Sequence, residues 1–481
     1  MRSAENKNMF FENGKYSDSS LSWGDLYPQV LASCTSLLMV IQPGLHLAYS
    51  NNLFHHMTSF KNGQFSWITS VVALCIPIGA LIIGQLMDRI GRKKACIITC
   101  LILLSSWTVA TFMTSDEIYW FFAFRILAGI GGGMTTVCMI YVSEISHSSY
   151  KQLLLSLNSV FFSGGILLST SIVQLEWNII NYTFIGLTVV NIVLIIINMP
   201  ESPIWILKFK SPEHVDEAKS AMQQLYPRNK QVFEREWERL KSTSSCCVAV
   251  ATGNSSFIES VRSNAAAYKP MVVLAFLLLL QQLTGAYPCI SYALPVLKRV
   301  LSGREYSISE IDSLTALGAI RFAAGLLTCA LSFYVGRKPL MMFSCAGMVL
   351  SSALVIVFQD FVTGPSTVPL PLCGVMLFVF SSSLGVLVFP WTMICELLST
   401  PVRAVGGCLL VSYTYVIMFM VLKVFPHVLE NLSVVGIYLF FGVTSLLMAA
   451  YVHFVVPETL GKSFHEIEAY FTKNLEKPDH M

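Results

Sequence analysis

Long apolar runs, separated by short polar or charged segments, fill the chain from about residue 29 to residue 456. A transmembrane helix needs about 20 predominantly apolar residues, and twelve runs reach that length. They lie near residues 29–49, 66–86, 95–115, 118–141, 152–174, 179–199, 270–297, 309–335, 339–360, 370–394, 403–425 and 432–456. We therefore predict an all-α polytopic membrane protein with twelve transmembrane helices, embedded in a lipid bilayer.

Polar segments divide these runs into two sets of six. The tail at 1–28 precedes the first set, which occupies 29–199, and the tail at 457–481 follows the second set, which occupies 270–456. The segment at 200–269 contains EHVDEAKSAMQQL and EREWERLKS, whose mixture of apolar and charged positions is typical of short amphipathic helices in water. The pattern predicts two six-helix bundles joined by a large polar loop.

The composition excludes other classes of protein. Of the 481 residues, 54% are hydrophobic and only 12% are charged, whereas soluble proteins carry about 25% charged residues. A soluble enzyme and a disordered chain are therefore excluded. The formal net charge of +3 gives no basis for nucleic-acid binding. The sequence has no Gly-rich phosphate loop, metal-ligand cluster or nucleophile–base spacing, so we expect no catalytic residue, no cofactor and no bound metal.

The basic residues predict the orientation in the membrane. Cytoplasmic segments of membrane proteins are enriched in Lys and Arg, and 24 of the 31 such residues fall on the side that holds both tails and the large loop. Three others, Arg125, Arg321 and Lys423, lie within spans. We expect both termini and the loop in the cytoplasm. Asn181 and Asn431 then begin N-x-S/T sequences on the outer side and are candidate glycan acceptors, although both lie close to the membrane.

Charged residues and glycines recur at matching places in the two halves. The recurring features are a Gly–Arg turn, a Glu followed seven residues later by a basic residue, and a Pro–Glu step at the end of each half. The residues are Asp88, Arg89, Gly91, Arg92, Glu144, Lys151 and Glu201 in the first half and Gly336, Arg337, Glu396, Arg403 and Glu458 in the second. We predict that they form a charge latch on the cytoplasmic side, which closes while the central path faces outward and breaks when it faces inward. The alternative is that these charges act only as topology anchors.

Seven short motifs follow one another in a fixed order. They are Asp88-Arg89-Ile-Gly91-Arg92-Lys93, Arg125-Ile-Leu-Ala-Gly129, Tyr141-Val-Ser-Glu144, Pro200-Glu201-Ser-Pro203-Ile-Trp205, Gln281-Gln282-Leu-Thr-Gly285, Pro390-Trp391 and Pro457-Glu458-Thr-Leu-Gly461-Lys462. In this order they resemble the sugar porter family of the major facilitator superfamily, and most of all its insect facilitated trehalose and hexose transporters. The resemblance covers roughly residues 29–470. It implies the major facilitator fold, in which two pseudo-symmetric six-helix bundles surround a central cavity and work by alternating access.

The resemblance also implies substrate-binding residues. Gln281 and Gln282 in the seventh span and Trp391 in the tenth match the family's sugar-contacting glutamines and tryptophan. Amides supply hydrogen bonds to hydroxyls, and an indole supplies a flat face for the C–H surface of a sugar. Gly285 and Pro390 weaken the same two helices, which fits a gating role. The alternatives are that the glutamines hydrogen-bond neighbouring helices and that Trp391 only packs.

Other positions depart from the family pattern. Tyr287 stands where the family has Asn, Ser159 where it has Gln, and Thr414-Tyr415 where it has Asn-Trp. Hydroxyls therefore replace several amides, and we keep these four residues as candidate substrate contacts, since tyrosine offers both a hydroxyl and a flat face. These departures weaken the expectation that glucose is the substrate. They weaken the expectation that the protein is a transporter much less.

Arg321 is the most unusual residue within a span. It precedes Gly336 by 15 residues, which places it about 22 Å from the cytoplasmic turn and beyond the middle of a core about 30 Å thick. No Asp or Glu lies deep in a span to pair with it, so we expect it to face the central cavity rather than lipid. There it contacts substrate hydroxyls or an anionic substrate, or it hydrogen-bonds neighbouring helices. Arg125 matches an Arg of the family, and we expect a structural or gating role for it.

The resemblance implies a facilitative uniporter that moves trehalose or a hexose, a small-molecule sugar, across the plasma membrane. Proton-coupled members of the family carry an acid in the first span, and this chain has none there. The alternatives are a transporter of another small polar solute such as an organic anion, a proton-coupled sugar symporter, and a sensor that binds sugar without passing it.

Overall fold

Helices make up all the regular structure in the part of the chain that the computed structural model describes. The described residues are 23–56, 62–113, 117–147, 150–210, 214–227, 230–250, 265–301, 308–332, 334–360, 370–398, 400–459, 466 and 470–471. Twelve segments among them are long and apolar enough to cross a membrane, which confirms the predicted all-α architecture with twelve spans. We number these segments span 1 to span 12 in chain order.

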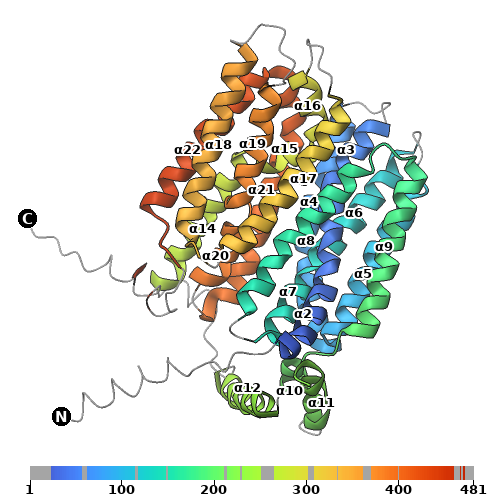
Figure 1. Ribbon diagram of the computed structural model, residues 1–481, viewed down its shortest axis with the longest axis vertical. Coiled ribbons are helices and arrows are strands. Elements are labelled where there is room, and N and C mark those ends of the chain that lie inside the picture. The colour runs from blue at the N-terminus through green and yellow to red at the C-terminus, as the bar shows by residue number, and fades with distance from the viewer. Residues whose placement is uncertain are drawn as a thin grey trace, which may run out of the picture.

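The first six spans lie on one side of the molecule (Figure 1). Two of them are interrupted: span 1 consists of α2 (Trp23–Leu37), the 3-10 turn η1 (Leu38–Val40) and α3 (Ile41–His56), and span 4 consists of α6 (Ile118–Met134) and α7 (Thr136–Ile145). The other four are single helices, namely α4 (Asn62–Ile90), α5 (Arg92–Ala110), α8 (Lys151–Ser171) and α9 (Trp177–Asn198).

The last six spans repeat this arrangement on the other side (Figure 1). Span 7 consists of α14 (Ala265–Leu283) and α15 (Ala286–Ser291), which α16 (Ala293–Leu301) follows, and span 10 consists of α19 (Leu370–Leu384) and α20 (Phe389–Leu397). The single helices are α17 (Glu310–Leu331), α18 (Arg337–Asp360), α21 (Thr400–Asn431) and α22 (Val434–Phe454). Spans 1, 4, 7 and 10 are thus the interrupted ones, at intervals of three spans.

Three helices of the large loop gather at one end of the bundle, which we call the loop end (Figure 1). They are α10 (Pro203–Phe209), α11 (Val215–Leu225) and α12 (Lys230–Val250). The last two correspond to the predicted amphipathic helices. Apolar side chains that include Trp205 and Trp237 join the hydrophobic core of the first six spans, so the loop helices are docked onto the bundle. We call the opposite end, where α3 and α16 lie, the remote end.

Small residues allow close contact between helices inside each half. Gly129 and Gly133 of span 4 face carbonyl oxygens of span 2, and a Cβ added at Gly133 would lie 2.0 Å from the carbonyl oxygen of Ile76. Helices in membranes associate through such close backbone contacts because lipid provides no hydrophobic drive between them. The glycines of span 4 therefore fix its distance from span 2.

The seam between the two halves contains two helix pairs, α8 with α17 and α4 with α21. Along the first pair, Thr315 donates from Oγ1 to the carbonyl oxygen of Thr170 at 3.1 Å, and Ser156 Oγ lies 2.9 Å from Cys329 Sγ. These contacts keep α8 and α17 together from the remote end towards the loop end.

Polar contacts also join the halves at the remote end. Asn51 of α3 donates from Nδ2 to the carbonyl oxygen of Ile290 at 3.0 Å and accepts from the backbone N–H of Leu294 at 2.9 Å. Lys423 of α21 donates from Nζ to Ser66 Oγ of α4 at 2.8 Å. We call these contacts the remote seal.

Candidate functional site

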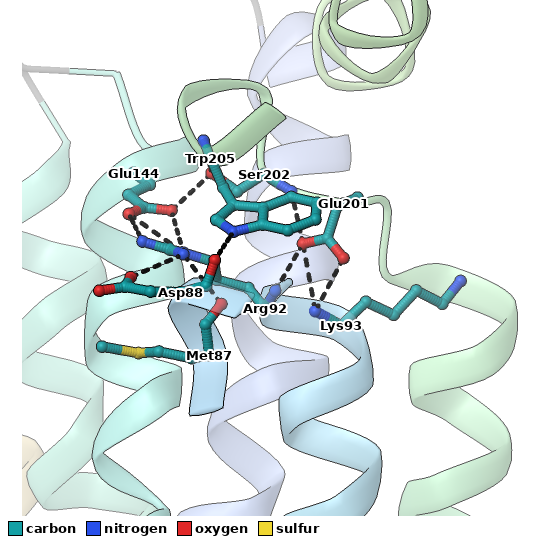
Figure 2. Close-up of polar contacts among 8 residues, drawn as sticks. All are labelled: Met87, Asp88, Arg92, Lys93, Glu144, Glu201, Ser202 and Trp205. Atoms are coloured by element: carbon teal, nitrogen blue, oxygen red, sulfur yellow. Dashed lines mark hydrogen bonds and ion pairs between the residues drawn. The ribbon is translucent and has the colours of Figure 1, made fainter. Parts of the chain in front are cut away.

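Arg92 is the centre of a charge cluster at the loop end of the first half (Figure 2). Its Nη2 and Nε donate to the two oxygens of Glu144 at 2.8 and 3.0 Å, and its Nη1 lies 3.2 Å from Asp88 Oδ1. Nη1 also donates to the carbonyl oxygen of Met87 at 3.1 Å. The guanidinium is buried and has two carboxylate partners, which is the arrangement that makes such pairs strong.

Glu201 completes this cluster through the backbone. Its carboxylate accepts from the N–H of Arg92 at 2.8 Å and from that of Lys93 at 3.2 Å, at the first turn of α5 (Figure 2). A carboxylate there satisfies free N–H groups and interacts favourably with the helix dipole. Gly91 precedes the helix with φ of 95°, and a Cβ on it would lie 2.5 Å from the Glu201 carboxylate. Glycine is therefore required in this turn.

The second half repeats the same contacts around Arg337. The guanidinium pairs with Glu396 at 3.2 Å, and Glu458 accepts from the backbone N–H groups of Arg337 and Lys338 at 3.0 and 3.1 Å. A Cβ on Gly336 would lie 2.4 Å from the Glu458 carboxylate. The predicted repeat of charges thus forms a repeat of contacts.

Hydroxyl groups complete both clusters. Ser202 Oγ donates to Glu144 Oε2 at 2.5 Å, and Thr459 Oγ1 donates to Glu396 Oε2 at 2.5 Å. Each hydroxyl residue directly follows the Glu that binds the helix N-terminus. The clusters have the same design, and each lies within one half of the molecule.

Two basic residues expected in the latch, Arg89 and Lys151, make none of these contacts among the described side chains, and the side chain of a third, Arg403, cannot be placed. Arg89 is exposed. Lys151 interacts electrostatically with Glu144 but forms no ion pair with it among the described side chains. Arg403 lies in the first turn of α21, and its side chain is outside the described part of the structure. The latch role of the two clusters stays a prediction.

A contact that the sequence did not predict joins the C-half cluster to the first half. The side-chain amide of Gln152, in the first turn of α8, lies against the guanidinium of Arg337. With its oxygen facing the arginine, it accepts from Nη1 at 2.9 Å. Gln152 therefore connects the halves at the loop end.

Gln281 and Gln282 lie where span 7 meets the break of span 10. Gln281 Nε2 donates to the carbonyl oxygen of Val386 at 2.7 Å, which lies between α19 and α20. Gln282 Nε2 is 3.5 Å from Gln281 Oε1, and Gln282 Oε1 is buried without a hydrogen-bond partner. Gln281 thus makes the interhelical bond that we considered as its alternative role, whereas Gln282 has an acceptor to spare.

Tyr287, Trp391 and Tyr415 come together from spans 7, 10 and 11, and we call them the aromatic cluster. Trp391 Nε1 donates to the Tyr287 hydroxyl at 3.1 Å, and the Trp391 and Tyr415 rings are 5.4 Å apart at their centres. The helix breaks of spans 7 and 10 position these rings: Gly285 has φ of 82°, and Pro390 lies in the first turn of α20. The predicted weakening of both helices is confirmed, and its role in gating stays a prediction.

The hydrogen bonds recorded for Thr414 and Ser159 are made with residues outside the aromatic cluster. Thr414 is buried, and its Oγ1 donates to the carbonyl oxygen of Leu410 within its own helix at 2.7 Å. Ser159 lies on α8, and its carbonyl oxygen accepts from Ser163 Oγ at 2.8 Å and faces Gly325 across the seam. Neither contact supports a direct role in binding a ligand.

Arg321 lies in the seam, buried in protein rather than turned to lipid. Its side chain is 6% exposed, and Nη1 donates to Ser383 Oγ of span 10 at 3.1 Å. The guanidinium carbon lies 5.8 Å from the ring centre of Phe162, which belongs to the other half. Arg321, which belongs to span 8, therefore contacts spans 5 and 10.

Arg125 connects spans 1 and 4. Its guanidinium donates to the carbonyl oxygen of His46 at 2.7 Å and to Ser50 Oγ at 3.0 Å, and it faces the rings of Tyr49 and Phe124. The side chain is fully buried. These contacts agree with the structural role that we expected.

The prediction that Asn181 is a glycan acceptor is wrong. Its side chain is fully buried in span 6, accepts from the Tyr49 hydroxyl, and donates to the carbonyl oxygen of Ala110 at 3.0 Å. The amide nitrogen that would carry the glycan is enclosed by packed helices, so the fold has no room for a glycan there. Asn431 is exposed at the end of α21, and its glycosylation stays a prediction.

Two residues of the remote seal were missed by the sequence analysis. Lys423 lies 4.0 Å from the centre of the Trp67 ring, a cation–π contact between the halves. A basic residue inside span 11 was a visible signal for it. Asn51 had no such signal, because an Asn within an apolar run says nothing about its partner.

Comparisons with known proteins agree with this architecture. A family model described as "Sugar (and other) transporter" matches residues 32–471. A facilitated trehalose transporter of Bombyx mori is 27% identical over 458 residues, which cover 93% of this chain and 87% of that protein. A sugar transporter of Arabidopsis thaliana is 26% identical and covers 87% of this chain and 82% of its own length. The inward-open xylose transporter XylE of E. coli has a TM-score of 0.72 at 16% identity, covering 92% of this chain and 98% of that one, which confirms the major facilitator fold.

Proposed function

The chain belongs to the sugar (and other) transporter family, and from this membership we propose that it carries trehalose or a hexose across the plasma membrane by alternating access. We further propose that it is a uniporter with both termini in the cytoplasm. The relatives named as facilitated trehalose transporters in Bombyx mori and Polypedilum vanderplanki, 27% and 26% identical, support the choice of substrate.

One observation carries the proposed binding site. The breaks of spans 7 and 10 meet around Gln282 and the aromatic cluster, which together offer an unused amide oxygen, tyrosine hydroxyls and an indole face. A sugar needs these two kinds of surface, hydrogen-bonding groups for its hydroxyls and a flat ring for its C–H face. Helices broken near a binding site are also the elements that move most easily in transporters.

The position of the interhalf contacts supports alternating access. The remote seal joins the halves at one end, while at the other end each charge cluster holds helix ends within one half and Gln152 reaches Arg337 across the halves. Rocking of the halves about the bound substrate would open one end and close the other. The remote end is extracellular in this proposal, because the basic residues gather at the loop end.

The polar residues near Arg125 support uniport. Asp25, in the first turn of α2, is the one carboxylate of span 1, and Leu26–His56 contains no Asp or Glu. Arg125 donates to a backbone carbonyl and a serine hydroxyl instead. A proton-coupled cycle needs a group that binds and releases the proton beside such a charge. No carboxylate in this span provides one.

Uptake into oocytes tests this function. We expect saturable uptake of radiolabelled trehalose or glucose that is the same at external pH 7.5 and 5.5, relative to water-injected oocytes. Uptake of neither sugar would contradict the proposed function. Strong stimulation at pH 5.5 would contradict the uniport mechanism but not sugar transport itself.

Epitope tags at both termini test the orientation. They should bind antibody only after the cells are permeabilised.

A substitution at Trp391 tests the binding site. Trp391→Ala should weaken sugar affinity by about tenfold, because an aromatic face contributes about 1 kcal/mol beyond its buried area. Trp391→Phe is the matched control, since it keeps a flat face and loses only the bond to Tyr287, and its loss should be smaller. Equal affinities for the wild type and Trp391→Ala would exclude this ring from the site.

A further inference from the structure

Arg321 lies at the middle of α17, a helix of 22 residues, and its guanidinium is only partly used. Nη1 donates to Ser383 Oγ at 3.1 Å, and within the described residues this is its one hydrogen bond. Nε is buried without a partner. Nε and Nη2 form the side of a guanidinium that binds a carboxylate with two parallel bonds, and neither atom has a hydrogen bond to another described residue.

The charge of Arg321 is also uncompensated. The described spans hold carboxylates only in their terminal turns, at Asp25, Asp88, Glu144, Glu310, Asp312, Asp360, Glu396 and Glu430. A buried charge that lacks both a counter-ion and hydrogen bonds is costly. The serine hydroxyl and the Phe162 ring compensate for only part of that cost.

The location of Arg321 places this charge beside the proposed substrate site. Ser383, its hydrogen-bond partner, lies at the end of α19, three residues before Val386, whose carbonyl oxygen accepts from Gln281. Gln281 adjoins Gln282, the residue with the unused acceptor. A sugar bound where the breaks of spans 7 and 10 meet is therefore placed near Arg321 in this inference.

We infer that this site selects a sugar acid, a hydroxylated ring that carries a carboxylate, such as a hexuronate, over the neutral sugar of the same shape. The carboxylate would bind Nε and Nη2 of Arg321, while the hydroxyls and the C–H face bind as in the neutral sugar. This inference rests on the proposed function, since it uses the same binding site. Charge-assisted bidentate bonds are roughly twice as strong as neutral ones, so the preference should be about tenfold or more.

Glucose and glucuronate provide the test, because they differ only at C6, a hydroxymethyl group in one and a carboxylate in the other. The full-length chain is reconstituted in proteoliposomes, and uptake of each labelled compound is measured at pH 7. Binding is measured separately as the rise in melting temperature of the detergent-solubilised protein. Lactate, a small carboxylate without a sugar ring, is the third probe.

Two substitutions separate charge from shape. Arg321→Gln removes the charge and keeps an amide, and it should bring the glucuronate preference from about tenfold to one or below. Arg321→Lys keeps the charge but loses the two parallel bonds, so it should retain only part of the preference. If Arg321→Gln does not fold, the comparison of Arg321→Lys with the wild type provides the test. Arg235→Gln, the same change at an exposed position of α12, should leave the preference as in the wild type.

The outcomes distinguish the two proposals. Uptake of glucose without a preference for glucuronate, or an unchanged preference in Arg321→Gln, overturns this inference and leaves the sugar transporter standing. Uptake of neither glucose nor glucuronate, or of lactate alone, overturns this inference, and it overturns the proposed function as well when trehalose is not taken up in the same proteoliposomes.

Discussion

Glu201 and Glu458 each place a carboxylate over the first backbone N–H groups of a helix that begins with an arginine. The sequence predicted from the repeated Gly–Arg and Pro–Glu steps that these residues belong together. It did not predict that the two glutamates bind backbone groups while Glu144 and Glu396 bind the guanidinium groups. Spacing along the chain shows which residues recur, but the choice of donor depends on where the helix ends lie in space.

The Gly91 turn allows a test at this scale. Gly91→Ala should lower the melting temperature and abolish transport, because a Cβ is disfavoured by about 1–2 kcal/mol at φ of 95° and would also collide with the Glu201 carboxylate. Gly84→Ala, two turns earlier in α4, is the matched control, since a Cβ there meets nothing within 4 Å. If both variants melt at the wild-type temperature, the tight turn is not important for stability.

The interrupted spans show what a sequence can predict about elements. Twelve spans followed from the lengths of the apolar runs, and the breaks of spans 7 and 10 follow from Gly285 and Pro390. The interruptions of spans 1 and 4, at η1 and Thr135, lie beside Pro43 and Gly131–Gly133, from which we predicted no break. A break is stable when other elements satisfy its free backbone groups, and such partners come from distant parts of the chain.

Span 10 demonstrates this dependence. Between α19 and α20, the N–H of Val386 donates to Ser344 Oγ at 3.0 Å and its carbonyl oxygen accepts from Gln281 at 2.7 Å. Gln281→Leu should therefore destabilise the protein by about 1–3 kcal/mol, the cost of a buried unsatisfied carbonyl. Gln282→Leu should cost less stability but weaken sugar binding. Thermal unfolding and sugar uptake are measured on both variants. If the two variants lose stability equally and lose uptake equally, this division of roles is excluded.

The docking of α12 should depend on pH. Glu236 lies 3.5 Å from the Nε2 of His147, just beyond α7, and 3.6 Å from Arg239 Nη1. The hydrogen bond from His147 lowers the pKa of the Glu236 carboxyl, burial opposes this effect, and Arg239 adds to it. A carboxyl with a lowered pKa contributes stability above its ordinary pKa near 4.5, and the contribution is lost as the pH falls through the lowered value.

Hydrogen exchange of α12 measures this effect. Glu236→Gln should speed exchange in α12 at pH 7, and the gap to the wild type should narrow at pH 3.5, after correction for intrinsic rates. Glu238→Gln is the control on the same helix, because that side chain is 72% exposed. A gap that is the same at both pH values would mean that the Glu236 charge does not hold α12.

At the scale of the whole molecule, the sequence predicted two halves but not which end is closed. The closed end depends on contacts between residues far apart in the chain, such as Asn51 and Ile290, which are 239 positions apart. Apolar patterning determines that a segment spans the membrane, and it contains no information about which spans meet across the seam. The contacts of the remote seal could therefore be identified only in the structure.

Lys423 should control the balance between the closed and open remote end. It donates to Ser66 across the seam and lies over the Trp67 ring, contacts that together contribute about 1–2 kcal/mol. Lys423→Met should shift the population towards the open remote end by about 5- to 30-fold. Cys289, which is 2% exposed beside Ile290 in the seal, should then react faster with an impermeant maleimide added outside intact cells, as measured by mass spectrometry of its peptide.

The same substitution outside the seam separates this effect from a general loss of stability. Lys241→Met changes an exposed lysine of α12 and should leave Cys289 labelling at the wild-type rate. A faster rate in Lys423→Met alone, suppressed by a saturating substrate, fits a seal that opens and closes during transport. Wild-type labelling in Lys423→Met would mean that Asn51 and its backbone partners hold the remote end without help from span 11. Rapid labelling of Cys289 from outside in the wild type would place the closed end of the resting protein opposite to the one inferred here.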